Sequence, residues 1–424
     1  MKRPHSGSAG TGKVLVLGDN YRVVLPIVRS LGRKGLKVHV AWCPPDSLAL
    51  RSKYVACTHS LPAYAPDDDR WCTALCELGS RERFDLIIPS TEFENLACQS
   101  RRAALEPDLR LAILSPDAYR ATSDKVETGR LARAVGVPYP STVTVSDTDD
   151  LERILATLTP PAVVKPCSSN TRAGSDKEFV QRVTDGDEMR RAVRVALLSQ
   201  PRVLVQELVP GRGAGVEVLA HEGTILFSFQ HNRLHETTGY GSAYRVSVPV
   251  NADLLDAARR LLGAIRYTGV GMIEFRVDPE RGHWCLLEIN GRFWGSLPLA
   301  VASGADFPYF LYEMLVRGRT SFPQAYRLGI RSRDLSLGLL WFARQITPPR
   351  DRRDQGWDIA RVPRPRLVAD MFRAVTFRDR IDTFDGDDLR PGFAELRAIF
   401  MAVIRDLLER ARPRTRAGEA GRHG

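Results

Sequence analysis

Long apolar segments are absent from this chain of 424 residues. No stretch approaches the roughly 20 consecutive apolar residues that a membrane-spanning helix needs. The basic start at Lys2 and Arg3 is not followed by the apolar core of a signal peptide, and the short run KVLVLG (13–18) is better explained as a buried strand. We therefore expect a cytoplasmic protein without a transmembrane segment.

Cysteine is scarce, and its spacing follows no metal-binding pattern. Cys72 and Cys76 could share one face of a helix, but no second pair completes a zinc site. The total of seven is odd and the positions are scattered, which favours reduced, mostly buried thiols. The seven residues are Cys43, Cys57, Cys72, Cys76, Cys98, Cys167 and Cys285.

Two common nucleotide-binding motifs are missing as well. The segment GSAGTGK (7–13) matches most of a phosphate-binding P-loop, but Val14 replaces the Ser or Thr whose hydroxyl binds magnesium. The segment also precedes a strand, whereas a P-loop follows one. The segment LGDNYR (17–22) lacks the G-x-G-x-x-G pattern of dinucleotide-binding domains. These absences disfavour a P-loop enzyme and an NAD-dependent oxidoreductase.

The charge of the chain is strongly positive, with a formal net charge of +11 and an arginine-rich tail. Such a balance permits contact with nucleic acid or with an anionic membrane. No nucleic-acid motif with interleaved aromatic residues is present, so we favour a solvated basic tail and expect no nucleic-acid partner. Peripheral membrane contact of the C-terminal region and a homodimer stay open as alternatives to simple packing.

Alternating strands and helices predict an α/β domain in the first quarter of the chain. Residues 1–12 are small and polar, and we expect them to be disordered. Apolar strand-like segments at 13–18, 36–42, 84–90 and 109–114 alternate with segments of helical periodicity. This pattern indicates a parallel sheet covered on both faces, and hence a Rossmann-like domain over residues 13–116.

The rest of the chain has a different pattern. Residues 117–325 read as an α+β unit with two subdomains, about 117–200 and 201–325, which contain hairpins at Glu222-Gly223 and at 278–282. Residues 326–424 contain helical periodicity and a basic tail, and we expect a helical C-terminal extension without obvious chemistry.

Acidic and amide side chains follow one another in the segment LLEINGRFWGS (286–296). Glu288 is expected to lie beside Glu274 of the segment MIEFR on a neighbouring hairpin strand, where two like charges repel each other. A divalent cation would reverse that penalty, and magnesium prefers oxygen ligands such as carboxylates and substrate phosphates. Asn290 and Arg292 continue the same strand face. The set Glu274, Glu288, Asn290 and Arg292 therefore predicts a magnesium–nucleotide site.

Three upstream features fit the same ligand. Lys165 ends the apolar strand AVVK, where a solitary ammonium needs an anionic partner. The loop SSNTRAG (168–174) offers amides and hydroxyls to phosphate. The segment VLVQELVPG (203–211) ends a strand at Gln206-Glu207 and could present main-chain groups to a base. Taken alone, that loop is a weak signal and the strand end is better explained as an ordinary turn.

Together these residues resemble the ATP-grasp superfamily, which includes the carbamoyl phosphate synthase large subunit, biotin carboxylase and D-alanine–D-alanine ligase. The segments RSLGRKG (29–35) and EINGRFWGS (288–296) are similar to its carboxylate–amine ligase, carbamoyl-phosphate-synthase-like branch. The resemblance covers residues 13–325. It implies a Rossmann-like pre-ATP-grasp domain, a two-subdomain ATP-grasp fold that clamps ATP and Mg²⁺, and a C-terminal extension outside the resemblance.

The resemblance also assigns roles to residues. It implies that the ATP phosphates are bound by Lys125, Lys165 and the loop residues Ser168, Ser169 and Gly174. It implies that adenine is held by Gln206, Glu207, Leu208 and Val209, and Glu217 is the candidate for ribose. It further implies that Mg²⁺ is bound by Glu274, Glu288 and Asn290, and that Arg292 stabilises the transferring phosphoryl group.

The implied activity is ATP-dependent carboxylate–amine ligation through an acyl phosphate, with release of ADP and phosphate. Residues 168–174 and 235–245 are candidate lids that would exclude water. Arg245 is either a catalytic contact to a substrate carboxylate or an exposed strand arginine, and Glu92, which follows Thr91 at a strand end, is a substrate-side candidate. The alternatives are a carbamoyl- or carboxyphosphate-forming enzyme, disfavoured because the chain has no duplicated half, and a non-catalytic nucleotide-binding module.

Overall fold

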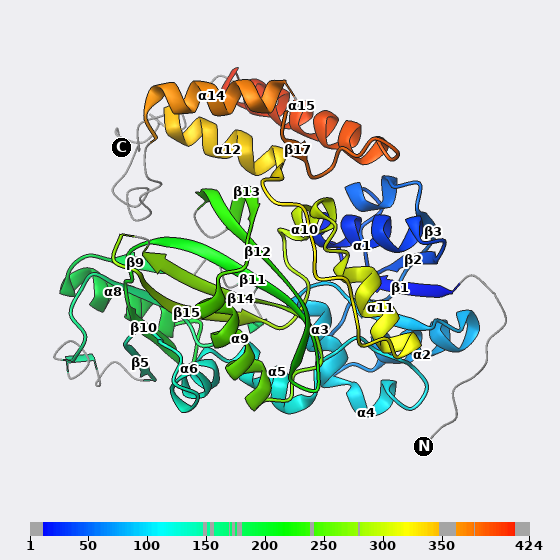
Figure 1. Ribbon diagram of the computed structural model, residues 1–424, viewed down its shortest axis with the longest axis horizontal. Coiled ribbons are helices and arrows are strands. Elements are labelled where there is room, and N and C mark those ends of the chain that lie inside the picture. Colours follow the sequence, from blue (N-terminus) through cyan, green and yellow to red (C-terminus); the bar gives the residue numbers. More distant parts are fainter. Residues whose placement is uncertain are drawn as a thin grey trace, which may run out of the picture.

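A computed structural model defines the fold (Figure 1). It describes residues 12–146, 151–152, 157–168, 170–171, 174–175, 180–237, 241–278, 280–346, 362–376 and 378–411. Predictions made above for residues 1–11, Ser169, 172–173 and 238–240 concern residues outside this part of the chain.

A parallel four-stranded sheet with the order β3-β2-β1-β4 forms the N-terminal part. Along β1, Val14 and Val16 face the core that includes α1, whereas Leu15 and Leu17 face the core that includes α2. Both faces are therefore covered, as the apolar strands predict. The elements are β1 (Lys13–Leu17), α1 (Tyr21–Arg33), β2 (Lys37–Ala41), η1 (Leu48–Arg51), β3 (Val55–His59), α2 (Arg70–Glu82), β4 (Leu86–Pro89), α3 (Glu92–Ser100) and α4 (Arg102–Leu105).

The strand predicted at 109–114 is wrong. This segment forms only a single bridge to β4, between Ile87 and Leu111. The pairing cannot continue along β4, because that strand ends at Pro89, which has no N–H to donate. The chain then leaves the sheet toward α5.

A second, antiparallel sheet has the order β5-β10-β6-β9 and packs against α8. Helices α5 and α6 precede it, and a two-stranded ribbon of β7 and β8 follows β6. The elements are α5 (Pro116–Ser123), α6 (Lys125–Ala134), β5 (Thr142–Val145), β6 (Ala162–Pro166), β7 (Asn170–Thr171), β8 (Gly174–Ser175), β9 (Gln181–Val183), α8 (Gly186–Leu197) and β10 (Val203–Glu207).

The largest sheet has seven strands in the order β15-β14-β11-β12-β13-β16-β17. Both predicted hairpins are present in it, and the turn between β11 and β12 has positive φ at Glu222 (51°) and Gly223 (83°), as a two-residue hairpin turn requires. The elements are β11 (Arg212–His221), β12 (Thr224–Thr237), β13 (Gly241–Val248), α9 (Ala252–Ala264), β14 (Gly269–Asp278), β15 (His283–Asn290), β16 (Arg331–Arg333) and β17 (Arg380–Ile381).

The two faces of this sheet differ in polarity. Val216, Val218, Ile273 and Phe275 point to one face and pack on α9 in an apolar core. The intervening residues point to the opposite face, because side chains alternate along a strand. That opposite face packs on the N-terminal part at one end, through residues such as Phe229, and carries charged side chains at the other.

The C-terminal extension is helical, as predicted, but it also adds β16 and β17 to the sheet, which the sequence pattern did not indicate.

Helices α10 and α11 pack on α1, and α12, α14 and α15 form an outer layer at one edge of the molecule (Figure 1). The domain boundaries proposed above stay predictions. The helices are α10 (Leu297–Ser303), α11 (Phe307–Arg317), α12 (Leu335–Ile346), α14 (Arg364–Val375) and α15 (Arg390–Ala411).

A buried ion pair anchors the extension to the N-terminal part. The Arg29 Nε on α1 donates to the Asp388 Oδ2 at 2.9 Å, and both side chains are almost completely buried. Asp388 also accepts hydrogen bonds from the Ser52 hydroxyl at 2.6 Å and from the Lys53 N–H at 3.0 Å. Each charge is therefore satisfied only while the extension is docked.

Replacing Asp388 with alanine should strongly destabilise the protein, because it leaves the Arg29 guanidinium buried without a counter-charge. We expect a loss of about 3–5 kcal/mol in the free energy of unfolding, measured by denaturant titration. Asp387→Ala is the matched control, since Asp387 is 42% exposed and pairs with Arg33 at the surface; it should cost less than about 1 kcal/mol. Equal losses in the two variants would contradict the anchoring role.

Candidate active site

The two carboxylates of the predicted metal site lie directly opposite each other. Glu274 on β14 and Glu288 on β15 are paired residues of the antiparallel ladder, and their side chains therefore share one face of the sheet. Glu274 is 8% exposed and Glu288 is half-buried. Two partly desolvated carboxylates at neighbouring positions repel each other unless positive charge lies between or beside them.

Asn290, the last residue of β15, and Arg292, two residues beyond it, continue this arrangement. The Asn290 Nδ2 donates to the Glu288 Oε1 at 3.2 Å, and the Arg292 Nη2 donates to the Asn290 Oδ1 at 3.0 Å. A chain of hydrogen bonds thus runs from the carboxylate through the amide to the guanidinium. The oxygen atoms of Glu274, Glu288 and Asn290 make a donor set that suits Mg²⁺.

Positive charge surrounds Glu288 on the side of the second sheet. Burial opposes the ionisation of Glu288, but the ammonium groups of Lys125 and Lys165, together with the Asn290 hydrogen bond and Arg292, bring the pKa of its carboxyl below the usual value. The carboxylate is therefore ionised at neutral pH, as a metal ligand must be.

Lys165 is buried, and its pKa is lowered. Burial and, next, the neighbouring Lys125 lower the pKa of Lys165 to about 8, against the opposing effect of Glu288 and Glu274. Its Nζ donates to the Gln206 Oε1 at 2.7 Å, and the Gln206 Nε2 donates to the Thr142 hydroxyl at 2.8 Å. Gln206 thus orients the ammonium, a role that the sequence did not predict for it.

The predicted adenine segment lies at the end of β10. The Glu207 N–H and the Leu208 N–H donate to the carbonyls of Ser141 and Pro161 at 2.8 and 3.2 Å, and the Glu207 Oε2 accepts from the Ser141 N–H at 3.3 Å. Two of the main-chain donors are therefore already engaged within the sheet. Contacts of Glu207, Leu208 and Val209 with a base stay a prediction.

The predicted phosphate loop is only partly described. Ser168 forms a bridge with Asp124, and the Lys125 N–H donates to the Cys167 carbonyl at 2.8 Å, so this end of the loop lies beside Lys125. Gly174 belongs to β8, opposite Thr171. Ser169, residues 172–173 and part of the second candidate lid (238–240) lie outside the described residues.

Glu217, the candidate for ribose binding, is completely buried on the charged face of the sheet. Its Oε1 lies 2.5 Å from the His231 Nδ1, and Gly215 leaves room for that imidazole, because a Cβ there would lie 2.7 Å from the His231 Cε1. Burial raises the pKa of Glu217 well above its usual value and lowers the pKa of His231 to about 3. The two groups therefore form a neutral hydrogen-bonded pair.

Glu217→Gln should change how stability depends on pH. A carboxyl whose pKa is raised on folding contributes its full stability below the unfolded pKa, near 4.3, and loses it as the pH rises toward the folded pKa. Glutamine does not titrate, so the variant should gain melting temperature relative to the wild type between pH 5 and pH 8. The exposed Glu222→Gln is the control, and a Glu217→Gln difference that is the same at both pH values would contradict the neutral pair.

Arg233, which was not predicted from the sequence as a site residue, forms an ion pair with Glu274. Arg233 lies on β12 opposite Gly213, on the same face as His231 and the two carboxylates. The alternation of His231 and Arg233 in the segment FSFQHNRLHE (227–236) is the signal that could have indicated a second charged row on this face. Without a cation, this guanidinium offsets the repulsion between Glu274 and Glu288.

Arg245 is not an exposed strand arginine, so that alternative is wrong. It is completely buried, its Nη1 donates to the Gly295 carbonyl at 3.0 Å, and its other terminal nitrogen binds Asp382 of the C-terminal extension. The extension thus already supplies the carboxylate that a substrate was expected to supply. A catalytic role of Arg245 stays a prediction.

The N-terminal part reaches the site through Glu92, which forms an ion pair with Arg292. Glu92 begins α3 at the end of β4, where ligands of open α/β sheets bind. A pocket at this junction is lined by side chains that include Glu92, Asn95, Tyr119, Lys125, Glu288 and Arg292. The substrate-side candidate Glu92 and the predicted metal ligands Glu288 and Asn290 therefore line one cavity.

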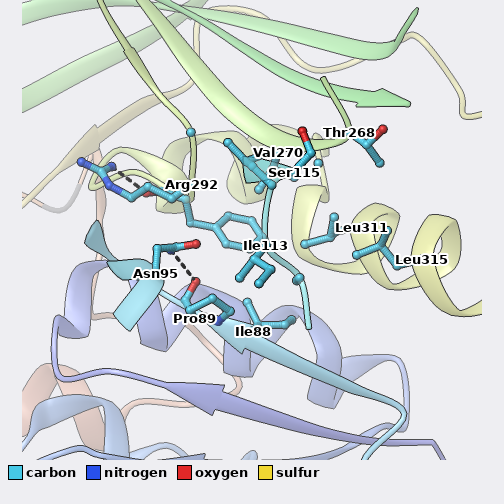
Figure 2. A pocket seen from close by; sticks show the side chains of 15 residues that line it. Ile88, Pro89, Asn95, Ile113, Ser115, Thr268, Val270, Arg292, Leu311 and Leu315 are labelled. Atoms are coloured by element: carbon cyan, nitrogen blue, oxygen red, sulfur yellow. Dashed lines mark hydrogen bonds between the residues drawn. The ribbon is translucent and has the colours of Figure 1, made fainter. Parts of the chain in front are cut away.

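A second pocket adjoins the first and is mainly apolar. Figure 2 shows Arg292 at one end of this pocket and Leu311 and Leu315 at the other. Ile88 and Val270 line its walls between the two parts of the chain. Space for an apolar group thus lies next to the charged site.

Comparisons with known proteins agree with this geometry. The family model "ATP-grasp in the biosynthetic pathway with Ter operon" matches residues 199–336. A D-alanine–D-alanine ligase from Gloeobacter violaceus is 30% identical over 214 residues, which span 46% of this chain and 68% of that ligase.

Two solved structures share the fold. The structure of a biotin carboxylase–βγ-ATP complex from Campylobacter jejuni superposes with a TM-score of 0.62 at 16% identity, over 76% of this chain and 74% of that one. An L-amino acid ligase from Bacillus licheniformis has a TM-score of 0.56 at 17% identity, over 73% and 75% of the two chains.

The chain belongs to the ATP-grasp superfamily. It is an ATP-dependent carboxylate–amine ligase, and the ATP and Mg²⁺ expected from the sequence are the cofactors of this class. The described residues contain no helix that is both long and apolar enough to cross a membrane.

Proposed function

We propose that the protein joins a small carboxylate to an amine through an acyl phosphate, and that one of the two substrates is an amino acid. The observation that carries this proposal is the facing pair Glu274 and Glu288 with Lys125, Lys165 and Arg292 around it. These groups can hold a triphosphate and its cation beside a carboxylate, and phosphoryl transfer needs positioning and charge neutralisation more than a protein nucleophile.

The reaction has two steps, phosphoryl transfer and attack of the amine, and neither forms a covalent bond to the protein. A carboxylate oxygen of the substrate attacks the γ-phosphorus, the bond to the β–γ bridging oxygen breaks, and ADP leaves. The amine nitrogen then attacks the acyl carbon and loses a proton, the bond to the phosphate oxygen breaks, and inorganic phosphate leaves. Mg²⁺ held by Glu274, Glu288 and Asn290 would neutralise phosphate charge.

This chain's own residues supply the remaining requirements. Lys125 and Lys165 attract the phosphates, and Gln206 fixes the Lys165 ammonium in place. Arg292 faces the transferring group and balances its negative charge. The candidate lids at 168–174 and 235–245 would exclude water from the acyl phosphate, which hydrolyses readily.

The residues that line the two adjoining pockets support an amino acid with a small apolar side chain as the substrate. The Glu92 carboxylate and the Arg292 guanidinium lie together in the cavity and complement the ammonium and the carboxylate of such a molecule. The adjoining pocket with Leu311 and Leu315 suits an apolar substituent. The names of the similar D-alanine–D-alanine ligase and L-amino acid ligase point to the same substrate class.

A screen for ADP release tests this function. Amino acids with apolar, polar and charged side chains and other small carboxylates are offered with ATP–Mg²⁺, each with and without amines, and the products are identified by mass spectrometry. We expect ADP and phosphate in step with an amide product, only when both substrates are present. Release of AMP and pyrophosphate, or turnover that depends on bicarbonate without an acyl acceptor, would contradict the proposal.

A further inference from the structure

The outer layer of the molecule concentrates apolar side chains on its surface. This layer, here called the C-terminal layer, consists of α12 (335–346), the segment 364–376 with α14, and residues 390–405 of α15 (Figure 1). Across the part of the chain that the structure describes, twelve of the sixteen exposed large apolar side chains lie between residues 339 and 403. Such a concentration on one part of a surface marks an interaction site.

The exposed apolar side chains follow helical spacing. On α15, Phe393, Leu396, Phe400 and Val403 recur at intervals of three and four residues and therefore form one stripe. Phe400 is 64% exposed. On α14 the exposed apolar side chains are Val368, Met371 and Phe372.

The acidic side chains of this region all point away from that surface. Asp370 binds His235, Asp379 binds Arg333 and Asp388 binds Arg29, so each carboxylate holds the layer to the body of the protein. The same holds for Asp382 with Arg245 and for Asp385 and Asp387 with Arg33. Glu395, the remaining acidic residue described between 362 and 405, is buried and accepts hydrogen bonds from Ser336 and Thr383 within the extension.

The arginines of the same region, unlike the acidic residues, are mostly exposed to solvent. Between residues 362 and 405, seven of the described arginines are exposed, and within the described chain none of the seven forms an ion pair with a protein carboxylate. The sequence after residue 405 adds five more arginines and three acidic residues, Asp406, Glu409 and Glu419. The seven are Arg364, Arg366, Arg378, Arg380, Arg390, Arg397 and Arg405.

We propose that the C-terminal layer docks on an anionic lipid surface. Exposed Phe, Met, Leu and Val side chains interspersed with arginines, with the acidic groups turned inward, are the features of a helix pair that lies in the interface of a bilayer. Arginines near such a surface are attracted to anionic headgroups, and the apolar side chains enter the boundary of the acyl chains. The proposal is independent of the ligase chemistry.

Other occupants fit this surface less well. A second copy of the chain docked through the same face would bring two sets of seven arginines together, and like charges repel each other. A nucleic acid would attract the arginines but would leave the stripe of Phe393, Phe400 and Val403 without an apolar partner.

Sedimentation with vesicles tests the docking. The full-length protein is mixed with vesicles of phosphatidylglycerol and phosphatidylcholine, or of phosphatidylcholine alone, at low and high salt. We expect cosedimentation with the anionic vesicles only, and weaker binding at high salt. Phe400→Ser combined with Val368→Ser should weaken the partitioning at least about tenfold, and Arg397→Glu should weaken it about fivefold or more.

Leu198→Ser, at the residue after α8, combined with Arg191→Glu on α8 is the matched control, because both residues are exposed but lie outside the C-terminal layer; it should bind like the wild type. All variants are also assayed for ADP release, which shows that they are folded. Three outcomes would overturn the proposal: no binding to anionic vesicles, binding that the layer variants leave unchanged, or a dimer in light scattering that Phe400→Ser dissociates. Capture by an oligonucleotide that is insensitive to Phe400→Ser would overturn it as well.

Discussion

Glu288→Ala should abolish ligation, with turnover falling about a thousand-fold or more. Glu288 is the carboxylate that faces Glu274 across the hairpin and lies next to Lys125 and Lys165. Its removal takes away a predicted Mg²⁺ ligand and the counter-charge of both lysines, which electrostatic catalysis of phosphoryl transfer requires. Losses of a hundred- to a thousand-fold are typical when even one preorganised polar contact is removed from an active site.

ADP release at saturating ATP–Mg²⁺ measures this effect, with circular dichroism and thermal unfolding to verify the fold. Glu222→Ala is the matched control, because Glu222 is a carboxylate of the same large sheet that pairs with Arg266 at the surface. It should keep wild-type turnover. If Glu288→Ala retained turnover, the metal assignment would be refuted even though the fold would stand.

Arg292→Ala should reduce turnover by about a hundred- to a thousand-fold, and Arg292→Lys should restore little of it. The guanidinium donates a hydrogen bond to Asn290 of the predicted metal site and forms an ion pair with Glu92 of the N-terminal part, so its N–H donors serve two partners at once. A lysine has one compact charge and cannot make both contacts in this geometry. We expect the loss mainly in kcat, because the charge to be balanced develops during phosphoryl transfer.

Steady-state kinetics with the substrates found in the screen separate kcat from KM. Arg266→Ala, which removes an exposed guanidinium from the surface pair with Glu222, is the control and should leave both constants unchanged. An Arg292→Lys variant with wild-type kcat would show that only a diffuse positive charge is needed at this position.

The sequence was sufficient to predict that the four residues proposed to bind the metal and the phosphoryl group lie close together. The residues Glu274, Glu288, Asn290 and Arg292 are close in sequence, and a hairpin with a short turn fixes their relative positions with little help from the rest of the chain. The sequence also predicted the α/β, α+β and helical character of successive parts of the chain, because strand and helix periodicities are local properties of the chain. The hairpin turn at Glu222-Gly223 is another local feature that could be predicted.

Contacts between distant segments could not be predicted in this way. Arg233 and Glu274 are 41 residues apart, and Arg245 and Asp382 are 137 apart. No local pattern indicates which strand follows which in a sheet of seven, or that the extension would add two strands to it. The same limit applied to residues 109–114, where the pattern of a strand was present but its partner β4 ended at Pro89.

By itself, then, the sequence determined the hairpin that carries the predicted metal ligands, because neighbouring strands of a hairpin bring side chains together through local geometry. Only the tertiary structure decided what surrounds this hairpin: the ion pair of Arg292 with Glu92, the buried pair of Glu217 with His231, and the carboxylates that turn inward from the C-terminal layer. Burial raises the pKa of Glu217 and lowers the pKa of His231, and burial depends on the packing of elements that lie far apart along the chain.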